Sequence, residues 1–199
     1  MSKAQKTKTH IIEQAAILFN QQGYSGSSLS DLMRVTGLQK GGIYNHFRSK
    51  DELALAAFDF AVHLVQQKLR GALKGKRHGV DRLMTILRVY EHMLEDPPVQ
   101  GGCPILNTAI ESDDTHPALR ERAQQAMDAW RFLIQRIVNQ GIKRGEFQAT
   151  VDADSVATVL IATIEGAVML SKLYGDPSYL KHSLQHLQTY IQEQLAATG

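Results

Sequence analysis

The sequence predicts an all-α fold, and three features support this. Apolar residues recur three or four positions apart along nearly the whole chain, which is the period of an amphipathic helix. No segment alternates apolar and polar residues over the length of a strand. Helix stop and start residues such as Gly23, Ser28 and Pro97 separate the periodic segments. Their order predicts an N-terminal three-helix domain containing a helix-turn-helix, followed by a C-terminal helical bundle that dimerises.

Composition limits the class of protein. With 43% apolar residues the chain can bury a core, and its single cysteine suits a reducing compartment such as the cytoplasm. The basic N-terminus is not followed by the apolar stretch of a signal peptide. No run approaches the roughly 18 uncharged apolar residues of a membrane helix. We therefore expect a cytoplasmic protein without a membrane span.

Positive charge is concentrated at the N-terminus. Residues 1–50 hold seven Lys and Arg against two Asp and Glu, whereas residues 51–199 hold fifteen against eighteen. A basic head on a mildly acidic body is typical of a domain that contacts phosphates and a body that does not. A solvated basic tail is the alternative explanation. We predict a domain of residues 1–50 and a second domain of residues 51–199.

The basic head contains local signals for three helices, over about residues 6–22, 28–36 and 40–47. Gly23 ends the first helix, and Ser28 with Asp31 forms a capping box that opens the second. Gly37 suits the turn before the third helix, because a residue with positive φ is often required there. A tight turn between two short helices is the arrangement that places a recognition helix in the major groove of DNA.

The body is predicted to contain several longer helices. Ser49 opens one that ends near Gly71, and further helices cover about residues 80–95, 105–111, 117–144 and 154–174. The last helix carries an apolar stripe of Leu180, Leu184, Leu187, Ile191 and Leu195. We expect the last two helices to form a homodimer interface. Burial of both stripes within one protomer is the alternative.

Residues 37–53, GLQKGGIYNHFRSKDEL, resemble the helix-turn-helix signature of the TetR family of bacterial repressors. The residues that match the signature in register are Gly37, Lys40, Gly41, Tyr44, His46, Phe47, Lys50, Glu52 and Leu53. The segment Gly145-Glu146-Phe147 also resembles the body domain of that family. The resemblance implies a dimeric regulator that binds a palindromic double-stranded DNA operator.

The resemblance, together with side-chain chemistry, predicts the DNA-contacting residues. Tyr44 and His46 would meet phosphates or groove edges, and Lys50 a phosphate at a helix N-terminus. Gln39 and Asn45 can pair with adenine, and Lys40 with guanine. The full predicted set is Ser28, Gln39, Lys40, Gly41, Gly42, Tyr44, Asn45, His46 and Lys50. A core helical hairpin is the alternative for this segment.

The resemblance also implies an effector cavity in the body. The candidate lining residues are Phe60, Leu64, Met84, Tyr90, Met93, Cys103, Trp130 and Met169. Met and aromatic residues at helical spacing also fit a plain core. The mainly apolar set predicts a small apolar effector. Cys103 at a helix N-terminus could instead react with an electrophile, and a buried packing thiol is the alternative.

We expect neither an enzyme nor a metalloprotein. The sequence contains no Ser/His/Asp arrangement and no phosphate-binding glycine loop. His182 and His186 share a helix face but supply only two metal ligands, so no metal site or cofactor is predicted. The predicted function is a transcriptional repressor released from DNA by a small effector. A helical interaction adaptor that does not bind DNA is the alternative.

Overall fold

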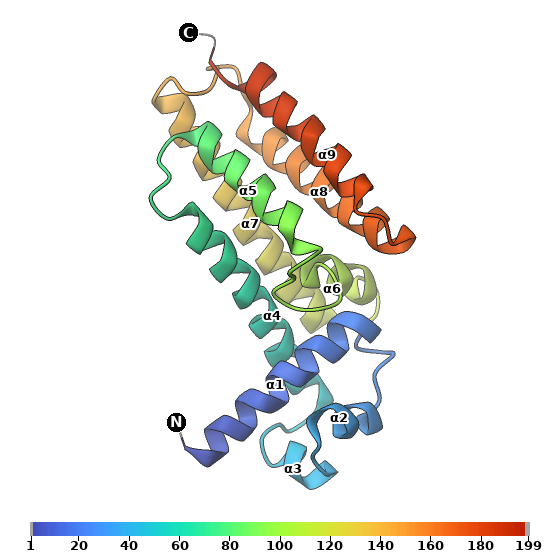
Figure 1. Ribbon diagram of the computed structural model, residues 1–199. Helices are drawn as coiled ribbons and strands as arrows, with labels where there is room; N and C mark the ends of the chain where they lie inside the picture. The colour runs from blue at the N-terminus through green and yellow to red at the C-terminus, as the bar shows by residue number, and fades with distance from the viewer. Residues whose placement is uncertain (1, 198–199) are drawn as a thin grey trace. The chain divides into compact units, whose positions relative to one another are not determined.

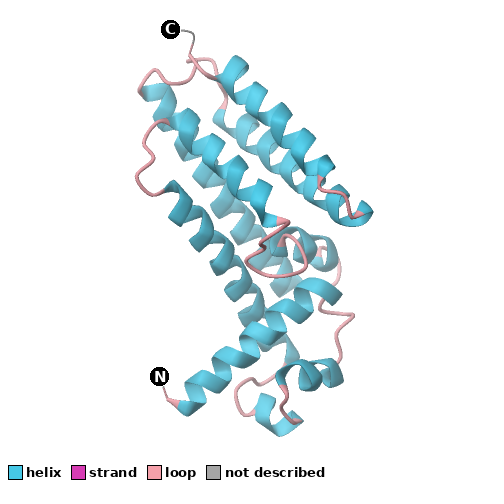
Figure 2. Ribbon diagram, in the orientation of Figure 1, coloured by secondary structure: helices cyan, strands magenta, loops and turns pink. Residues whose placement is uncertain are grey.

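The computed structural model describes residues 2–197, which form two compact units. Unit 1 comprises the residues up to 65 and residues 98–126, and unit 2 comprises residues 66–97 and those from 127 onward. The division falls within α4 (Lys50–Leu73) and α7 (Pro117–Lys143), so each of these helices contributes to both units. Among the described residues the only β-type pairing is an isolated bridge between Phe147 and Ala196 (Figure 2). The all-α prediction is confirmed.

Unit 1 contains α1 (Lys3–Gln22), α2 (Leu29–Thr36), α3 (Lys40–Tyr44) and α6 (Pro104–Ser112) (Figure 1). Ser2 caps α1 by accepting a hydrogen bond from the Gln5 N–H, so this helix begins earlier than predicted. Gly23 ends α1 with φ 77°, as predicted.

The third helix is shorter than predicted and ends at Tyr44, not near residue 47. Its first residue lacks a side-chain cap, and two adjacent glycines weaken it. The His46 N–H donates to the Ile43 carbonyl, which tightens the last turn and carries the chain inward. Phe47 is therefore buried in the core of unit 1 rather than presented on a helix face.

The core of unit 1 explains why the short helices hold their positions. The apolar face of α1 buries Ile11 and Ala15 against Leu32 of α2, Ile43 of α3 and Leu53 of α4. Because these side chains are buried, Ser30 and Arg34 of α2 and Lys40 of α3 are left on the outer surface.

Unit 2 contains α5 (Gly79–Met93), α8 (Ala153–Tyr174) and α9 (Ser178–Thr189), followed by a π-helical turn at Tyr190–Leu195. Helix α9 packs against α8 and α5. The five-residue apolar stripe that runs from α9 into the π-helical turn is at most 4% exposed in a single chain. The expectation that this stripe is available to a second copy is wrong, because the protomer itself buries it.

Helix α8 has both buried and exposed apolar residues. Val156, Leu160 and Ile164 are buried, whereas Met169 is 47% and Leu173 70% exposed. By length and composition α8 could cross a membrane, but half of its most apolar stretch is packed inside the described protein, as in a core helix. The exposed residues give α8, unlike the stripe of α9, an apolar surface that is available to a partner.

Phe147 connects three elements of unit 2, and two glycines make room for its ring. A β-carbon on Gly79 or Gly141 would lie 2.5 or 2.3 Å from ring atoms of Phe147. Glu146 completes this junction by accepting the Gly79 N–H at 2.7 Å. The Gly-Glu-Phe segment is therefore a packing element that joins α7 to the start of α5.

Candidate functional site

The start of α2 is fixed by the predicted capping box. The Ser28 hydroxyl accepts the Asp31 N–H at 3.1 Å, and Asp31 accepts the Ser28 N–H at 2.9 Å. Hydrogen bonds from the side chain and backbone of Ser28, and then from Arg34, lower the pKa of Asp31 to about 2. The turn after α2 uses Gly37 in the left-handed conformation, with φ 69°. Both local predictions are confirmed.

The surface of α3 presents the polar residues that the sequence singled out. Gln39, Lys40 and Asn45 are exposed, whereas Tyr44 and His46 are half-buried. Gln39 makes no side-chain cap bond, so its amide group is available to another partner. This part of unit 1 therefore offers amide, ammonium, phenol and imidazole groups within residues 39–46.

The glycine pair of α3 gives this surface a bare stretch of backbone. A β-carbon added to Gly41 would meet nothing within 4 Å, and one added to Gly42 would only touch Leu38 at 3.4 Å. Packing within the chain therefore does not require Gly41. A large ligand such as a DNA duplex could approach the backbone closely at this position.

Lys50 has partners within unit 1 that the sequence did not reveal. Its ammonium donates to the Tyr24 carbonyl at 2.5 Å and lies 4.2 Å from the centre of the Tyr24 ring. Burial lowers the pKa of Lys50, although Glu111 and Asp51 partly oppose this shift. Lys50 thus stabilises the turn between α1 and α2. A phosphate that bound Lys50 would share its ammonium group with the Tyr24 carbonyl.

Polar contacts of Tyr24 link the turn between α1 and α2 to α4 and to the residue before α7. The Tyr24 hydroxyl donates to Asp51 of α4, and the Tyr24 ring lies edge-on to His116, with centroids 4.9 Å apart. Burial and then the Asp51 hydrogen bond raise the pKa of Tyr24 to about 12. The hydrogen bond from Tyr24 lowers the pKa of Asp51. His116 lies 3.6 Å from Asp51 and adds a further ionic contact when protonated.

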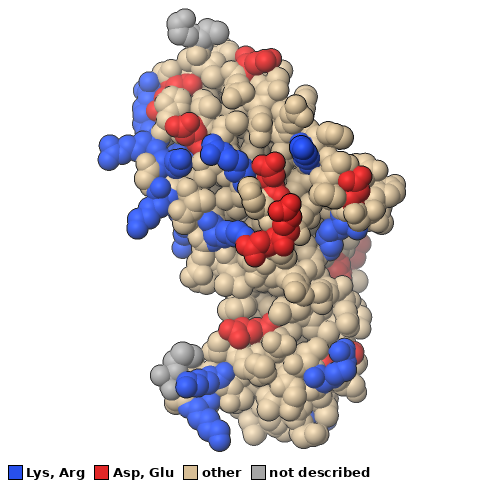
Figure 3. Space-filling model, in the orientation of Figure 1, with Lys and Arg blue, Asp and Glu red and all other residues tan. Residues whose placement is uncertain are grey.

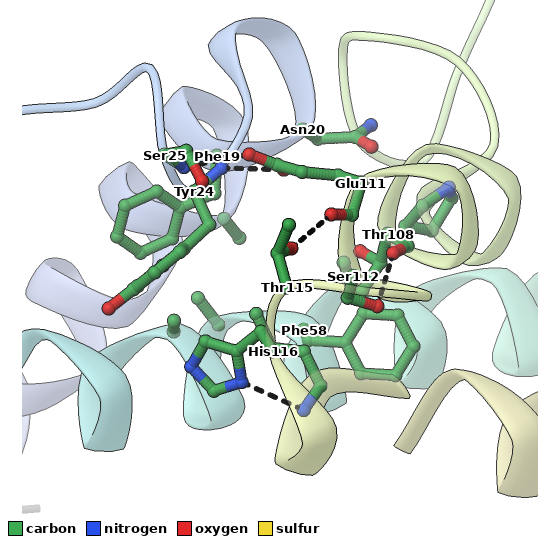
Figure 4. Close-up of a pocket in the computed structure, with 16 residues that line it drawn as sticks. Phe19, Asn20, Tyr24, Ser25, Phe58, Thr108, Glu111, Ser112, Thr115 and His116 are labelled. Atoms are coloured by element: carbon green, nitrogen blue, oxygen red, sulfur yellow. Dashed lines mark hydrogen bonds between the residues drawn. The ribbon is translucent and has the colours of Figure 1, made fainter. Parts of the chain in front are cut away.

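Glu111 of α6 holds the same turn from the other side. Its two carboxylate oxygens accept the Tyr24 N–H at 2.8 Å and the Ser25 N–H at 2.7 Å (Figure 4). A β-carbon on Gly23 would lie 2.8 Å from the Glu111 carboxylate, so only glycine leaves room for this approach. One side chain of α6 therefore fixes the backbone that leads into α2.

A pair of asparagines extends this junction along α1. The Asn107 amide donates to the Asn20 carbonyl oxygen at 3.0 Å and to its side-chain oxygen at 2.9 Å. The Asn20 amide in turn donates to the carbonyls of Gln100 and Gly102, at 2.9 and 3.0 Å. Asn20 is buried, so these bonds satisfy groups that water cannot reach. The end of α1 is thereby joined to α6 and to the loop before it.

Sequence reasoning missed this junction. Glu111 and Asn107 each lie 87 residues from their partners, and no local pattern marks such pairs. The only signal was the presence of polar residues on the short apolar helix after Cys103.

A small pocket lies beside the junction, between α1, α4 and α6. Figure 4 shows Tyr24, Glu111, Thr115 and His116 around it. Its volume is about 30 Å³, which is room for about two water molecules. This pocket is too small for an organic effector in the conformation described.

The predicted effector residues are divided between the two units. Phe60, Leu64 and Cys103 belong to unit 1, and the other five belong to unit 2. Tyr90 and Trp130 stack with ring centroids 5.1 Å apart, as a core pair does. The expectation that Met169 lines an interior cavity is wrong, because Met169 is exposed on α8. None of the eight residues lines the small pocket or the groove between α4 and α5 described below.

Cys103 occupies a defined backbone position. It is the N-cap of α6, is partly buried, and is followed by Pro104 at the first helical position. A helix N-terminus favours the thiolate form of a cysteine. The sequence had left a reactive and a packing role open, and this position is compatible with both. Among residues 2–197, no three His, Cys, Asp or Glu side chains gather as metal ligands would.

Two family profiles match the chain. "Bacterial regulatory proteins, tetR family" covers residues 11–57, and "Tetracyclin repressor-like, C-terminal domain" covers residues 79–187. The first match contains α2, α3 and the start of α4, which is the surface described above.

Individual proteins resemble the chain over most of its length. The crystal structure of a TetR transcriptional regulator from Chloroflexus aurantiacus has a TM-score of 0.96 and 50% identity, covering 100% of both chains. The transcriptional regulator TtgR of Pseudomonas putida is 28% identical over 87% of this chain and 84% of its own length. The transcriptional repressor DhaR of a Mycobacterium species is 24% identical over 83% of this chain and 82% of its own.

Replacing Glu111 with alanine should destabilise unit 1 by about 2 kcal/mol, because two N–H groups lose a charged acceptor. Urea unfolding followed by circular dichroism measures this change. The matched control is Glu121→Ala, which removes an exposed carboxylate that bonds only to the Gln125 amide in α7. Equal stability of the two variants would contradict the proposed role of Glu111.

Acid should weaken the start of α2 in a defined pH range. Asp31 has a folded pKa of about 2 and an ordinary value of 3.8, so its stabilising contribution is present above about pH 4 and is lost as pH falls toward 2. We expect the difference in urea midpoint between the parent and Asp31→Asn to shrink over that range. In a Ser28→Ala background the difference should already be small at neutral pH. A difference that is independent of pH would exclude this account.

Proposed function

This chain belongs to the TetR family of bacterial transcriptional regulators, and on that premise we propose that it is a repressor released from its operator by a small molecule. Its relatives are regulators and not enzymes. Since the target of a bacterial regulator is chromosomal DNA, we place its action in the cytoplasm. Repression is the role named for the relative DhaR, and we extend it to this chain as part of the proposal.

The exposed surface of α3 is the observation that carries the proposal. Lys40 and Asn45 are exposed, and the bare backbone at Gly41 permits close approach to a duplex. An asparagine amide can pair with adenine, and a lysine with guanine or a phosphate. We propose that α3 enters the major groove and that Ser28, at the start of α2, meets the backbone of the DNA.

We propose that two copies bind a palindromic operator. TetR-family regulators bind operators as dimers, and a two-fold reader matches a two-fold site. The exposed apolar residues Met169, Leu173 and Tyr174 of α8 supply a surface for the second copy. The polar outer side of α9 would extend it, since the apolar side of that helix is already buried.

We propose further that the effector acts through α6. This helix carries Glu111, which fixes the turn before α2, and begins at Cys103, where an electrophile could react. An apolar molecule that repacked the core residues beside α6 would shift the same junction. Either event would change the population of the DNA-binding form by its differential affinity for the two forms.

A single charge removal tests the DNA-binding surface. Lys40→Ala should weaken binding to a duplex selected from a random pool by about tenfold, and lower the salt slope by about one if Lys40 meets a phosphate. The matched control is Lys74→Ala, an exposed lysine in the turn after α4, which should bind as the parent does. Fluorescence anisotropy in rising salt measures both quantities. Binding that is indifferent to salt and to Lys40 would favour the helical adaptor instead.

A further inference from the structure

We infer that unit 2 carries a binding groove for a small organic anion with an apolar body. The groove lies between the C-terminal part of α4 and α5 and has a volume of about 390 Å³. The groove is open to solvent on its outer side, so it would hold a ligand against its floor without enclosing it. None of the effector residues expected from the sequence lines it.

The helical spacing of the two walls explains the groove. Lys68 and Ala72 lie four positions apart on one face of α4, Lys76 lies in the turn after that helix, and the α5 residues are three or four positions apart on one face. The lining residues are Lys68, Ala72 and Lys76 on the first wall and Thr85, Arg88, Val89 and His92 on the second. Three of these residues are permanent cations, and none is acidic.

The floor of the groove is not polar enough to bind a hydrophilic ion alone. Ala72 and Val89 are half-buried, and the Thr85 hydroxyl is already used, because it donates to the Asp81 carbonyl at 2.6 Å. The polar groups left for a ligand are therefore the cations at the walls. A hydrocarbon body on the floor and one anionic group at the wall would satisfy both surfaces.

Lys68 already binds a carboxylate in this structure. Its ammonium donates to the Asp96 carboxylate at 2.8 Å and to the Asp96 carbonyl at 2.6 Å. Asp96 does not line the groove, lies in the segment after α5 and is highly exposed. An anion in the groove would compete with Asp96 for Lys68, so carboxylate chemistry is compatible with this wall.

The neighbouring surface of unit 2 carries charges of both signs. Figure 3 shows Lys and Arg gathered over the turn between α4 and α5 and near the end of α7, and Asp and Glu over α5 and the segment after it. Arg144, directly after α7, donates to the Arg77 carbonyl at 2.7 Å and lies 3.5 Å from Glu146. The attraction of the groove for an anion therefore depends on the cations that line it.

Binding at the groove would be coupled to regulation through the chain, and this part of the inference rests on the proposed function. Asp96 precedes by four residues Gln100, whose carbonyl accepts from Asn20 at the end of α1. An anion that takes Lys68 from Asp96 would release the segment that leads into this junction. The inferred groove ligand is therefore an anionic effector.

Calorimetric titration of the full chain at low salt tests the groove without DNA. The probes are octanoate, octyl phosphate, octanol and octylamine, which share one hydrocarbon tail. We expect at least one of the two anions to bind, and the one that binds more tightly identifies the preferred anionic group, carboxylate or phosphate. Octanol should bind at least about tenfold more weakly than that anion. Octylamine should not bind.

Variants locate the site. The double variant Lys76→Gln/Arg88→Gln, at two exposed positions, should lose about tenfold in affinity for the preferred anion. The matched control Arg70→Gln/Lys74→Gln removes two exposed cations of the same region that do not line the groove, and should bind as the parent does. Unchanged binding in the first variant, or equal binding of octanol and octanoate, would overturn the inference.

DNA release is measured separately by anisotropy. If the chain binds the anion but no DNA, the proposed function is wrong and the inferred anion site stands. If it binds DNA but no anion, only the inferred anion site is wrong.

Discussion

The carboxylate of Glu111 is the contact on which the arrangement of unit 1 depends. It accepts two consecutive N–H groups of the turn between α1 and α2, while Lys50 holds the carbonyl of Tyr24 in the same turn. Opposite charges thus fix the two sides of one short segment. Ser28, the N-cap of α2, follows this turn closely in the chain. A displacement of α6 would therefore be transmitted to α2 through a short stretch of backbone. The asparagine pair prevents the end of α1 from moving independently.

We propose that positive charge serves different purposes in the two units. In unit 1 the cations near α3 lie on a surface whose apolar side chains are buried beneath it, which suits a flat and highly charged partner such as a duplex. In unit 2 the cations line a groove with an apolar floor, which suits a small amphipathic partner. Net charge alone would not separate these roles, because the distinction comes from the shape and polarity of the surface beside each cation.

The sequence predicted those features of the fold that depend on interactions between residues close together in the chain. The Ser28 capping box, the Gly23 stop and the left-handed Gly37 each depend on residues at most four apart, and each was predictable. The contact of Lys50 with Tyr24, 26 residues away, gives no local pattern and could not be predicted. The stripe of α9 looked like an interface because a buried stripe and a docking stripe have the same spacing. Contacts between residues far apart in the sequence determine whether such a side chain is buried or exposed, and residue spacing does not reveal those contacts.

The central claim is that α2 and α3 face the DNA. Hydrogen–deuterium exchange, with and without a duplex that the protein selects from a random pool, tests it most directly. The account predicts slower exchange at the start of α2 and across residues 39–50 when the duplex is present, and unchanged exchange in the basic turn between α4 and α5. Protection of that turn with no change at α3 would contradict the account.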